Sequence, residues 1–262
     1  IEGFSKSLRF FFNKGIPVRV VGRGSNLLIC DGGILGAVIR PAGGEFEEVK
    51  ISENVLTAGV GARYKKVSNV AKANGVGGFE WMEGIPGNVG GGLRMNAGAM
   101  GFETFDQVVS IKYLDSEGEL HEKMAEEFES NYRNVPQLNE NYAVSAVLKG
   151  TKGDIKSIDN RIRESVERRK RTQPIAASAG CIFKNPTDVS AGQLIEELGL
   201  KNANVGGARV SEVHGNFIVN DGEASAQDVI LLIEEIKLKV KKERAIELET
   251  EVQIIGQEKL KF

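Results

Sequence analysis

The sequence predicts an α+β fold, in which strands and helices alternate without a regular order. Short apolar segments typical of strands and longer amphipathic segments typical of helices both occur along the 262 residues. These segments form no repeated strand–helix–strand units, so a doubly wound parallel sheet is not expected. The length suffices for one large domain or two ordinary ones. We expect a division at residue 154, where the clearest helix in the middle of the chain begins.

The part of the chain before residue 154 is expected to hold two helices and six strands. Gly15 and Gly75 end the helices, since glycine readily adopts the backbone conformation that closes a helix. Asp31-Gly32-Gly33 and Ser116-Glu117-Gly118 are turn signals between strands. The expected helices are 5–14 and 64–74, and the expected strands are 18–21, 27–29, 37–39, 55–60, 108–114 and 142–148.

The part from residue 154 onward is expected to start with a helix and to continue as a smaller α+β unit. Asp154 can cap this helix, and the apolar stripe that begins at Ile155 is expected to pack in a core. Ser190 is the expected cap of a later helix that ends at Gly199. The expected helices are 154–171, 190–199 and 225–244, and the expected strands are 217–220 and 252–255. We therefore predict two domains, 1–153 and 154–262, connected by the first of these helices.

Composition and charge argue against several classes of partner. The net charge is −2, so no broad basic surface for nucleic acid is expected. The basic run 168–171 is interpreted as a solvated helix face. No segment approaches the roughly 18 apolar residues of a membrane span, so no membrane partner is expected. Two cysteines, Cys30 and Cys181, make no disulfide framework, which favours a reducing cytoplasm.

Glycine is the compositional outlier, with 32 residues against 6 prolines. The loop 22–26 starts like a dinucleotide-binding fingerprint, but the third glycine would fall at Leu27 and a strand follows. A hairpin turn is therefore an alternative interpretation of this loop. The longer segment 84–101 is expected to expose several consecutive backbone N–H groups, which suits a pyrophosphate. Two such loops could hold the two ends of one dinucleotide, whose identity the loops leave open.

Taken in order, these loops and several later motifs resemble the UDP-N-acetylenolpyruvoylglucosamine reductase family, flavoenzymes of bacterial peptidoglycan precursor synthesis. The similar segments extend from about residue 18 to about residue 256, and their order makes the set specific. The motifs that carry the resemblance are Gly22–Leu28, Gly84–Gly101 with its Asn96–Ala99 ending, Tyr132-Arg133, Gln173-Pro174, Ser178–Pro186, His214–Asn220 and Leu248–Val252.

The resemblance implies an FAD-binding domain of the vanillyl-alcohol-oxidase type, followed by a smaller α+β substrate-binding domain. The family's usual segment before the first helix is absent, so an N-terminal part of the FAD domain is expected to be missing. The direct run from the helix 154–171 into Gln173 resembles the shorter subtype of the family. The residues expected to bind FAD are Gly22, Arg23, Gly24, Ser25, Asn26, Leu27, Gly84, Ile85, Pro86, Gly87, Val89, Gly90, Gly91, Asn96, Gly98 and Ala99.

The implied reaction reduces the enolpyruvyl ether of UDP-N-acetylglucosamine to UDP-N-acetylmuramate, with NADPH as hydride donor. FAD is expected to be held non-covalently, because neither glycine loop contains a histidine or cysteine. Arg133 would stabilise the developing negative charge, although a surface arginine is the alternative. Cys181 would donate the proton where the family usually has serine; a small buried apolar residue is the alternative.

Glu251 would share a proton with the substrate or orient the donor. Glu249 is expected on the same strand face, and only the family pattern selects Glu251; a salt bridge is the alternative for either. By resemblance, Lys184, Asn185 and Gln173 would bind the substrate.

The remaining candidates are assigned structural roles or left open. His214 is either structural or a contact residue, and Cys30 is expected in the core. The sequence contains no cluster of histidine, cysteine and aspartate residues with the spacing of metal ligands, so no metal is expected. Another FAD-linked oxidoreductase of this fold, acting on a small hydroxylated substrate, is the competing function. The C-terminal residues Cys181, Lys184, Asn185 and Glu251 separate the implied reductase from this competitor. A sugar-nucleotide binding module is a third function; it would need no flavin, so an absorption spectrum would distinguish it.

Overall fold

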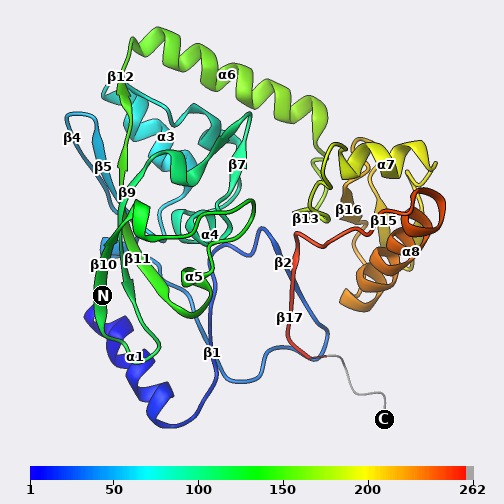
Figure 1. Cartoon of the computed structure of the whole chain (residues 1–262), viewed down its shortest axis with the longest axis horizontal. Helices are drawn as coiled ribbons and strands as arrows, with labels where there is room; N and C mark the ends of the chain where they lie inside the picture. The colour runs from blue at the N-terminus through cyan, green and yellow to red at the C-terminus, as the bar shows by residue number, and fades with distance from the viewer. Residues whose placement is uncertain (258–262) are drawn as a thin grey trace. The chain divides into compact units, whose positions relative to one another are not determined.

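The computed structural model describes residues 1–257 and divides the chain into two compact units (Figure 1). The first unit contains residues 1–23 and 36–168, and the second contains residues 24–35 and the chain from Arg169 onward. Each unit has its own hydrophobic core.

The first unit is built on a five-stranded antiparallel sheet with the strand order β10-β9-β11-β5-β4. Two irregularities shift the register of β11 against β9, one after Ala143 and one after Val147. The strands are β4 (Val49–Ser52), β5 (Val55–Gly59), β9 (Val108–Leu114), β10 (Leu120–Met124) and β11 (Tyr142–Lys149).

Helices α3 (Tyr64–Ala73) and α4 (Val89–Met95) share the core of this sheet. Val67 and Ala71 of α3 lie four residues apart on one helix face, and both are fully buried. Leu93 of α4 is also fully buried in the same cluster. The glycine-rich segment that leads into α4 is therefore anchored to the sheet by apolar packing.

The other elements of the first unit are short, apart from the N-terminal helix. That helix packs Phe4 and Leu8 against Leu114 and Val144 in a separate small cluster. These elements are α1 (Glu2–Asn13), β1 (Val18–Val20), β3 (Ala37–Ile39), α2 (Gly44–Glu47), β6 (Val76–Gly77), η1 (Glu80–Gly84), β7 (Gly98–Ala99), β8 (Phe102–Glu103), η2 (Thr104–Asp106), η3 (Ala125–Glu127), α5 (Gln137–Glu140) and β12 (Thr151–Lys152).

The hairpin interpretation of the loop 22–26 is wrong. Strand β1 before the loop pairs in parallel with β3. Strand β2 (Leu27–Ile29) after the loop pairs in parallel with β17 (Gln253–Ile255), near the other end of the chain. The loop therefore leaves the first unit at Arg23 and enters the second at Gly24.

The second unit contains a four-stranded antiparallel sheet with the order β13-β16-β15-β14 and two helices. Ile233, Ile236 and Val240 of α8 pack in one cluster with Ile182 and Ile218. The elements are β13 (Ser178–Cys181), α7 (Ala191–Glu197), β14 (Asn204–Val205), β15 (Ala208–Val210), β16 (Phe217–Asn220) and α8 (Ala226–Arg244).

Helix α6 (Ile155–Thr172) crosses from one unit to the other, because the division falls after Arg168. The predicted cap is confirmed: Asp154 Oδ2 accepts from the Ser157 N–H at 2.9 Å. Ile158 and Ile162 are buried, as the stripe predicts, but Ile155 is half exposed.

Ser190 is the N-cap residue of α7, as predicted, but its side chain makes no capping hydrogen bond. The first N–H of α7, at Ala191, instead donates to Asn185 Oδ1 at 3.1 Å. An amide five residues before Ser190 thus satisfies this donor.

The predicted α+β class is confirmed, and several strands, such as 27–29 and 108–114, have the predicted bounds. Within residues 1–257, none of the helices has the length and apolar character needed to cross a bilayer.

Candidate active site

The two glycine loops meet within the first unit. Arg23 Nε donates to the carbonyl oxygen of Pro86 at 3.1 Å. Gly22 faces Asn88 so closely that an added Cβ would lie 2.5 Å from Asn88 Oδ1. Any larger residue at position 22 would displace the side chain of Asn88. The structure therefore brings the start of the first loop onto the second, as one dinucleotide requires.

The loop 22–26 presents consecutive open donors. Within residues 1–257, the backbone N–H groups of these five residues take part in no hydrogen bond of the chain. The loop closes on itself where the Leu27 N–H donates to Gly24 O at 3.1 Å, and Gly24 has a φ of 74°. Such a row of N–H groups suits the oxygens of a pyrophosphate, so these residues fit FAD.

The second loop does not present open donors throughout, which corrects the expectation for its middle part. The N–H groups of Val89 and Gly90 donate to Ala62 O and Val60 O, both at 2.9 Å. The Gly92 N–H donates to Asn88 O at 3.0 Å, within the first turn of α4. The sequence did not indicate helix α4, because its first four residues are valine and three glycines, which have low helix propensity.

Part of the glycine content of this segment serves packing between protein groups. A Cβ at Gly92 would lie 1.6 Å from the hydroxyl oxygen of Tyr64. That hydroxyl is 2.6 Å from Thr104 Oγ1, and burial raises the pKa of Tyr64 well above its ordinary value. Gly92 therefore lets α4 lie directly on a buried, neutral tyrosine.

Other predicted FAD-binding residues frame the two ends of the second loop. Gly84 ends η1, the Ile85 N–H donates to Met82 O at 3.1 Å, and Gly87 O accepts from the Tyr64 N–H at 3.3 Å. Gly98 and Ala99 form β7, which pairs with β8. Gly91, by contrast, is exposed on α4.

Asn96 is a buried structural residue that contacts Arg133. Its Oδ1 accepts from the Phe105 N–H at 3.1 Å, and its Nδ2 donates to Glu103 Oε2 at 2.8 Å. Arg133 Nη1 approaches the carbonyl oxygen of Asn96 at 3.5 Å. The side chain of Asn96 is thus committed within the protein, and its backbone helps to place Arg133.

Arg133 occupies a strained position in a tight turn. Asn131 and Asn134 exchange both backbone hydrogen bonds, which leaves Tyr132 and Arg133 as the turn residues. Arg133 has a φ of 59°, a conformation that costs a non-glycine residue about 1–2 kcal/mol. Its guanidinium carbon lies 4.7 Å from the centre of the Tyr132 ring. Arg133 is therefore a half-buried, positioned residue and not a freely solvated one.

Within the second unit, the end of the first loop contacts the segment that contains Glu251. Asn26 Nδ2 donates to the carbonyl oxygen of Glu251 at 3.0 Å, and the Gln253 N–H donates to Asn26 O at 3.0 Å. A Cβ at Gly180 would lie 3.6 Å from Ser25 O. The loop, the strand that ends in Cys181 and the segment of Glu251 are therefore neighbours in this unit.

Cys181 is partly exposed at the end of β13, opposite Phe217 of β16. Burial lowers the pKa of Arg169, and the negative charge of an ionised Cys181 opposes this shift. Arg169 is thus close enough to interact electrostatically with the sulfur. The basic run 168–171 is exposed as predicted except at Arg169, which is half-buried.

Glu249 and Glu251 lie beside the Cys181 segment and not in a regular strand. A single antiparallel bridge pairs Thr250 with Phe183, and the Glu251 N–H donates to Ile182 O at 2.8 Å. Glu249 is largely exposed and forms an ion pair with Lys184 at 2.5 Å. The salt-bridge alternative therefore holds for Glu249, and Lys184 is held by it.

A residue absent from the predicted site holds the Cys181 segment in place. Asn216 is buried, its Oδ1 accepts from the Phe183 N–H at 2.9 Å, and its Nδ2 donates to Phe183 O at 2.8 Å. This asparagine lies within the motif 214–220, but nothing in the sequence indicated its partner.

The remaining candidates of the second unit have mainly structural contacts. His214 Nδ1 accepts from the Asn216 N–H at 3.1 Å, and its ring packs on Phe217 with 5.0 Å between centroids. Gln173 is half-buried directly after α6, and its N–H donates to Arg169 O at 2.9 Å. Cys30 is buried just after β2, as expected.

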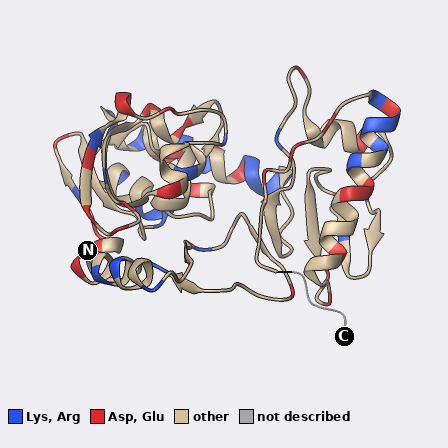
Figure 2. Ribbon diagram, turned by 60° about the horizontal axis from the view of Figure 1, so that its bottom comes forward, with Lys and Arg blue, Asp and Glu red and all other residues tan. Residues whose placement is uncertain are grey.

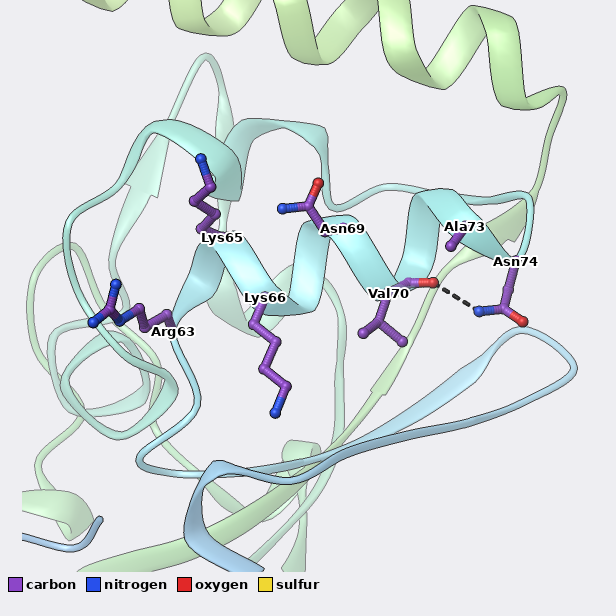
Figure 3. Close-up of a pocket in the computed structure, with 7 residues that line it drawn as sticks. All are labelled: Arg63, Lys65, Lys66, Asn69, Val70, Ala73 and Asn74. Atoms are coloured by element: carbon purple, nitrogen blue, oxygen red, sulfur yellow. Dashed lines mark hydrogen bonds between the residues drawn. The ribbon is translucent and has the colours of Figure 1, made fainter. Parts of the chain in front are cut away.

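A hollow of the first unit is lined by none of the predicted site residues. It has a volume of about 460 Å³ and is open along one face of α3 (Figure 3). Arg63, Lys65 and Lys66 extend beside it, and Val70 and Ala73 form its apolar part. None of its lining residues is a predicted site residue, so the hollow does not define the candidate site.

Charges are mixed over the surface of both units. Figure 2 shows lysine and arginine residues interspersed with acidic residues, on α8 for example. Among residues 1–257, no three His, Cys, Asp or Glu side chains are grouped so as to hold a metal ion.

Comparison with known proteins defines the class and then the family. Residues 1–123 match the family model of the FAD binding domain, so the chain is a flavoprotein with an additional C-terminal unit. Residues 172–255 match the model of the UDP-N-acetylenolpyruvoylglucosamine reductase C-terminal domain. The chain belongs to the UDP-N-acetylenolpyruvoylglucosamine reductase family.

Similar proteins cover most of the chain. A UDP-N-acetylenolpyruvoylglucosamine reductase of Clostridium tetani is 44% identical over 94% of this chain and 80% of its own length. One of Clostridioides difficile is 40% identical over 98% of this chain and 85% of its own length. The crystal structure of the reductase from Thermus caldophilus has a TM-score of 0.82 at 35% identity, covering 94% of this chain and 88% of that one. These similarities confirm the predicted family, the FAD-dependent class of enzyme and the fold.

Proposed function

We propose that the protein reduces the enolpyruvyl ether of UDP-N-acetylglucosamine to UDP-N-acetylmuramate in the cytoplasm, using NADPH, as a step of peptidoglycan precursor synthesis. The names of its relatives supply the substrate class. The observation that carries the proposal is the hydrogen bond from Asn26 to Glu251, with Gly180 beside Ser25. Through these contacts the end of the loop 22–26, which suits FAD, lies next to the strand that ends in Cys181, the proposed proton donor.

Bound FAD would take a hydride from NADPH and pass it to the terminal carbon of the enol ether. The chain would hold FAD non-covalently, with the open N–H groups of residues 22–26 around the pyrophosphate. We assign the flavin mainly to residues 1–153 and the substrate mainly to residues 154–262, with the segment 24–35 folded into the second unit.

Arg133 would stabilise the negative charge that develops at the substrate carboxylate. Its planar guanidinium offers several donors, and a fixed donor acts without reorganisation at the moment of reaction. The strained turn and the contacts with Tyr132 and Asn96 limit the conformations of this side chain. A positioned cation of this kind fits a role in the second half of the reaction.

Cys181 would donate its thiol proton to the carbon that bears the ether oxygen and carboxylate. The hydride and this proton together reduce the double bond, and the resulting thiolate would take a new proton from water. A thiol has an ordinary pKa near ~8.5, so it is mostly protonated at neutral pH. Arg169 is placed to stabilise the thiolate that remains after the transfer.

Glu251 would orient the donor or share a proton with the substrate, and its backbone is fixed by Ile182 and Asn26. Lys184, Asn185 and Gln173 would bind the nucleotide or sugar part. Lys184 supplies a point charge for phosphate, and its ion pair with Glu249 would have to open or reorient when substrate binds.

The proposal is tested by NADPH oxidation with and without the enolpyruvyl sugar nucleotide. We expect the purified protein to carry FAD and to oxidise NADPH rapidly only when this substrate is present. Oxidation that depends on a small hydroxylated compound instead would favour the competing FAD enzyme. Protein that takes up no flavin would contradict both.

A further inference from the structure

Glu83 carries a buried carboxylate oxygen that the protein does not satisfy. Its side chain is only 10% exposed, and its Oε1 lies 2.9 Å from Lys65 Nζ. Its Oε2 is buried and has no hydrogen-bond partner within residues 1–257. A buried charged group without a full set of partners is unfavourable, so such an oxygen points to a missing donor.

The position of Glu83 places this oxygen at the second glycine loop. Glu83 is the penultimate residue of η1, which continues directly into Gly84 and Pro86. Helix η1 also packs beside α3, which supplies Lys65, and beside β7 at the far end of the same loop. The short helix that carries Glu83 therefore adjoins both ends of the segment 84–101.

The neighbouring glutamate of the same short helix provides a comparison. Glu80 Oε1 accepts from Arg161 Nε at 2.9 Å and from Arg161 Nη2 at 2.6 Å. Glu80 Oε2 accepts from the Gly78 N–H at 2.7 Å. The chain thus satisfies both oxygens of Glu80 but only one of Glu83, whose second oxygen has no donor within residues 1–257.

We propose that Glu83 Oε2 accepts a hydrogen bond from a hydroxyl of bound FAD. Hydroxyls occur on the ribityl chain and on the adenosine ribose, and an acidic residue that binds a sugar hydroxyl recurs in dinucleotide sites. Lys65 holds the other oxygen and so orients the carboxylate. This inference rests on the binding of FAD, and it adds a binding residue outside the glycine loops themselves.

The test compares FAD affinity among apoproteins prepared from the holoprotein by removal of the flavin. Glu83→Met removes both oxygens at similar length, and Glu83→Gln keeps one neutral acceptor. Loss of a hydrogen bond to a charged group should weaken FAD binding roughly ten- to a hundredfold in Glu83→Met, measured by quenching of flavin fluorescence. Glu83→Gln should weaken it less, and it decides the outcome if the methionine variant does not fold.

Glu80→Gln is the matched control, because it changes a glutamate of the same helix whose oxygens have protein partners. It should lower the melting temperature and leave FAD affinity within about twofold. Riboflavin and ADP distinguish the two hydroxyl sources. A weaker affinity for riboflavin in the Glu83 variants assigns the ribityl chain, and a weaker affinity for ADP assigns the ribose.

Wild-type affinity for FAD in both Glu83 variants would overturn the proposal and leave the enzyme's use of FAD intact. Failure of the unaltered protein to bind FAD would instead contradict the proposed function.

Discussion

Asn26 Nδ2 donates a hydrogen bond to the backbone carbonyl of Glu251, with 3.0 Å between the two atoms. The two residues are 225 positions apart in the sequence. Asn26 ends the row of open N–H groups, and Glu251 follows the residue that pairs with Phe183. One amide therefore couples the proposed pyrophosphate loop to the segment beside Cys181.

Replacing Asn26 by leucine should impair both FAD affinity and turnover. The change removes the shorter of two side-chain hydrogen bonds to the Glu251 carbonyl and leaves only the one from Gln253 Nε2 at 3.4 Å, a loss of about 0.5–1.5 kcal/mol. Asn54→Leu is the matched control, since Asn54 Nδ2 donates to Gly150 O at 2.8 Å in the first unit. Both variants should lose stability in chemical denaturation. If FAD affinity and turnover were the same in the two variants, the Asn26 contact would contribute to stability alone.

Arg133→Ala should slow reoxidation of the reduced flavin by substrate by roughly 10²–10³-fold, the typical loss for an electrostatic donor. Flavin reduction by NADPH should change far less, because Arg133 is assigned to the other half of the reaction. Stopped-flow absorbance measures both halves separately.

Arg133→Gly supplies a second readout from the backbone. Glycine relieves the strain at a φ of 59°, so this variant should be about 1 kcal/mol more stable than Arg133→Ala at the same loss of turnover. A glycine variant no more stable than the alanine variant would contradict the strained geometry. Equal losses in both half-reactions would assign Arg133 to flavin placement.

Cys181→Ala should leave flavin reduction nearly unchanged and slow substrate reduction by about 10²–10⁴-fold, as expected for lost general acid catalysis. Cys181→Ser should recover much of that loss, because serine is the residue that the family usually has. Mild peroxide should inactivate the unaltered protein and spare the serine variant, since only the thiol oxidises. An alanine variant with normal reoxidation by substrate would show that the proton comes from another group, with Glu251 next to be tested.

Gly92→Ala should destabilise the protein by about 1–3 kcal/mol and weaken FAD binding. The added methyl would overlap the buried hydroxyl of Tyr64 and displace α4. Gly91→Ala is the matched change one residue earlier, where the added carbon meets only Asn88 Oδ1 at 3.4 Å. It should be neutral or slightly stabilising, because alanine favours the helix. Similar thermal denaturation of the two variants would contradict the described packing of α4.

Stability should decrease as the pH falls below about 6.5, in part through His214. Burial lowers the pKa of His214, Glu196 opposes this shift, and Lys201 adds to it. The unfolded chain therefore binds the proton at a higher pH than the folded one, so protonation favours unfolding between the two pKa values. His214→Asn keeps an acceptor for the Asn216 N–H and should show a smaller loss between about pH 6.5 and 5. An unchanged pH dependence in this variant would rule out His214 as its source.

The features predicted well from the sequence depend on local pattern. The strands 27–29 and 108–114 and the cap at Asp154 follow from apolar runs and from a side chain three residues from its partner. The glycine loop 22–26 was recognisable because it starts like a dinucleotide-binding fingerprint. The family motifs extended these local observations to FAD and to the residue types of the site.

The features that were missed depend on contacts between distant segments. The pairing of β2 with β17 joins residues more than two hundred positions apart, and no local pattern indicates it. Asn185, and not the N-cap residue Ser190, supplies the side-chain acceptor at the start of α7, because the fold brings its amide to Ala191. In the sequence Arg169 cannot be told from the other basic residues of the run 168–171, and only its partial burial in the structure distinguishes it from them. The unsatisfied oxygen of Glu83 likewise has no sequence signal.

Reoxidation of the reduced flavin distinguishes a reductase of the enolpyruvyl group from any other FAD enzyme. The holoprotein is reduced with NADPH in the absence of oxygen, and one equivalent of UDP-N-acetylglucosamine enolpyruvate is then added. We predict that flavin absorbance returns and that UDP-N-acetylmuramate forms in equal amount. A flavin that stays reduced with this substrate and is reoxidised only when oxygen is admitted would contradict the proposed function.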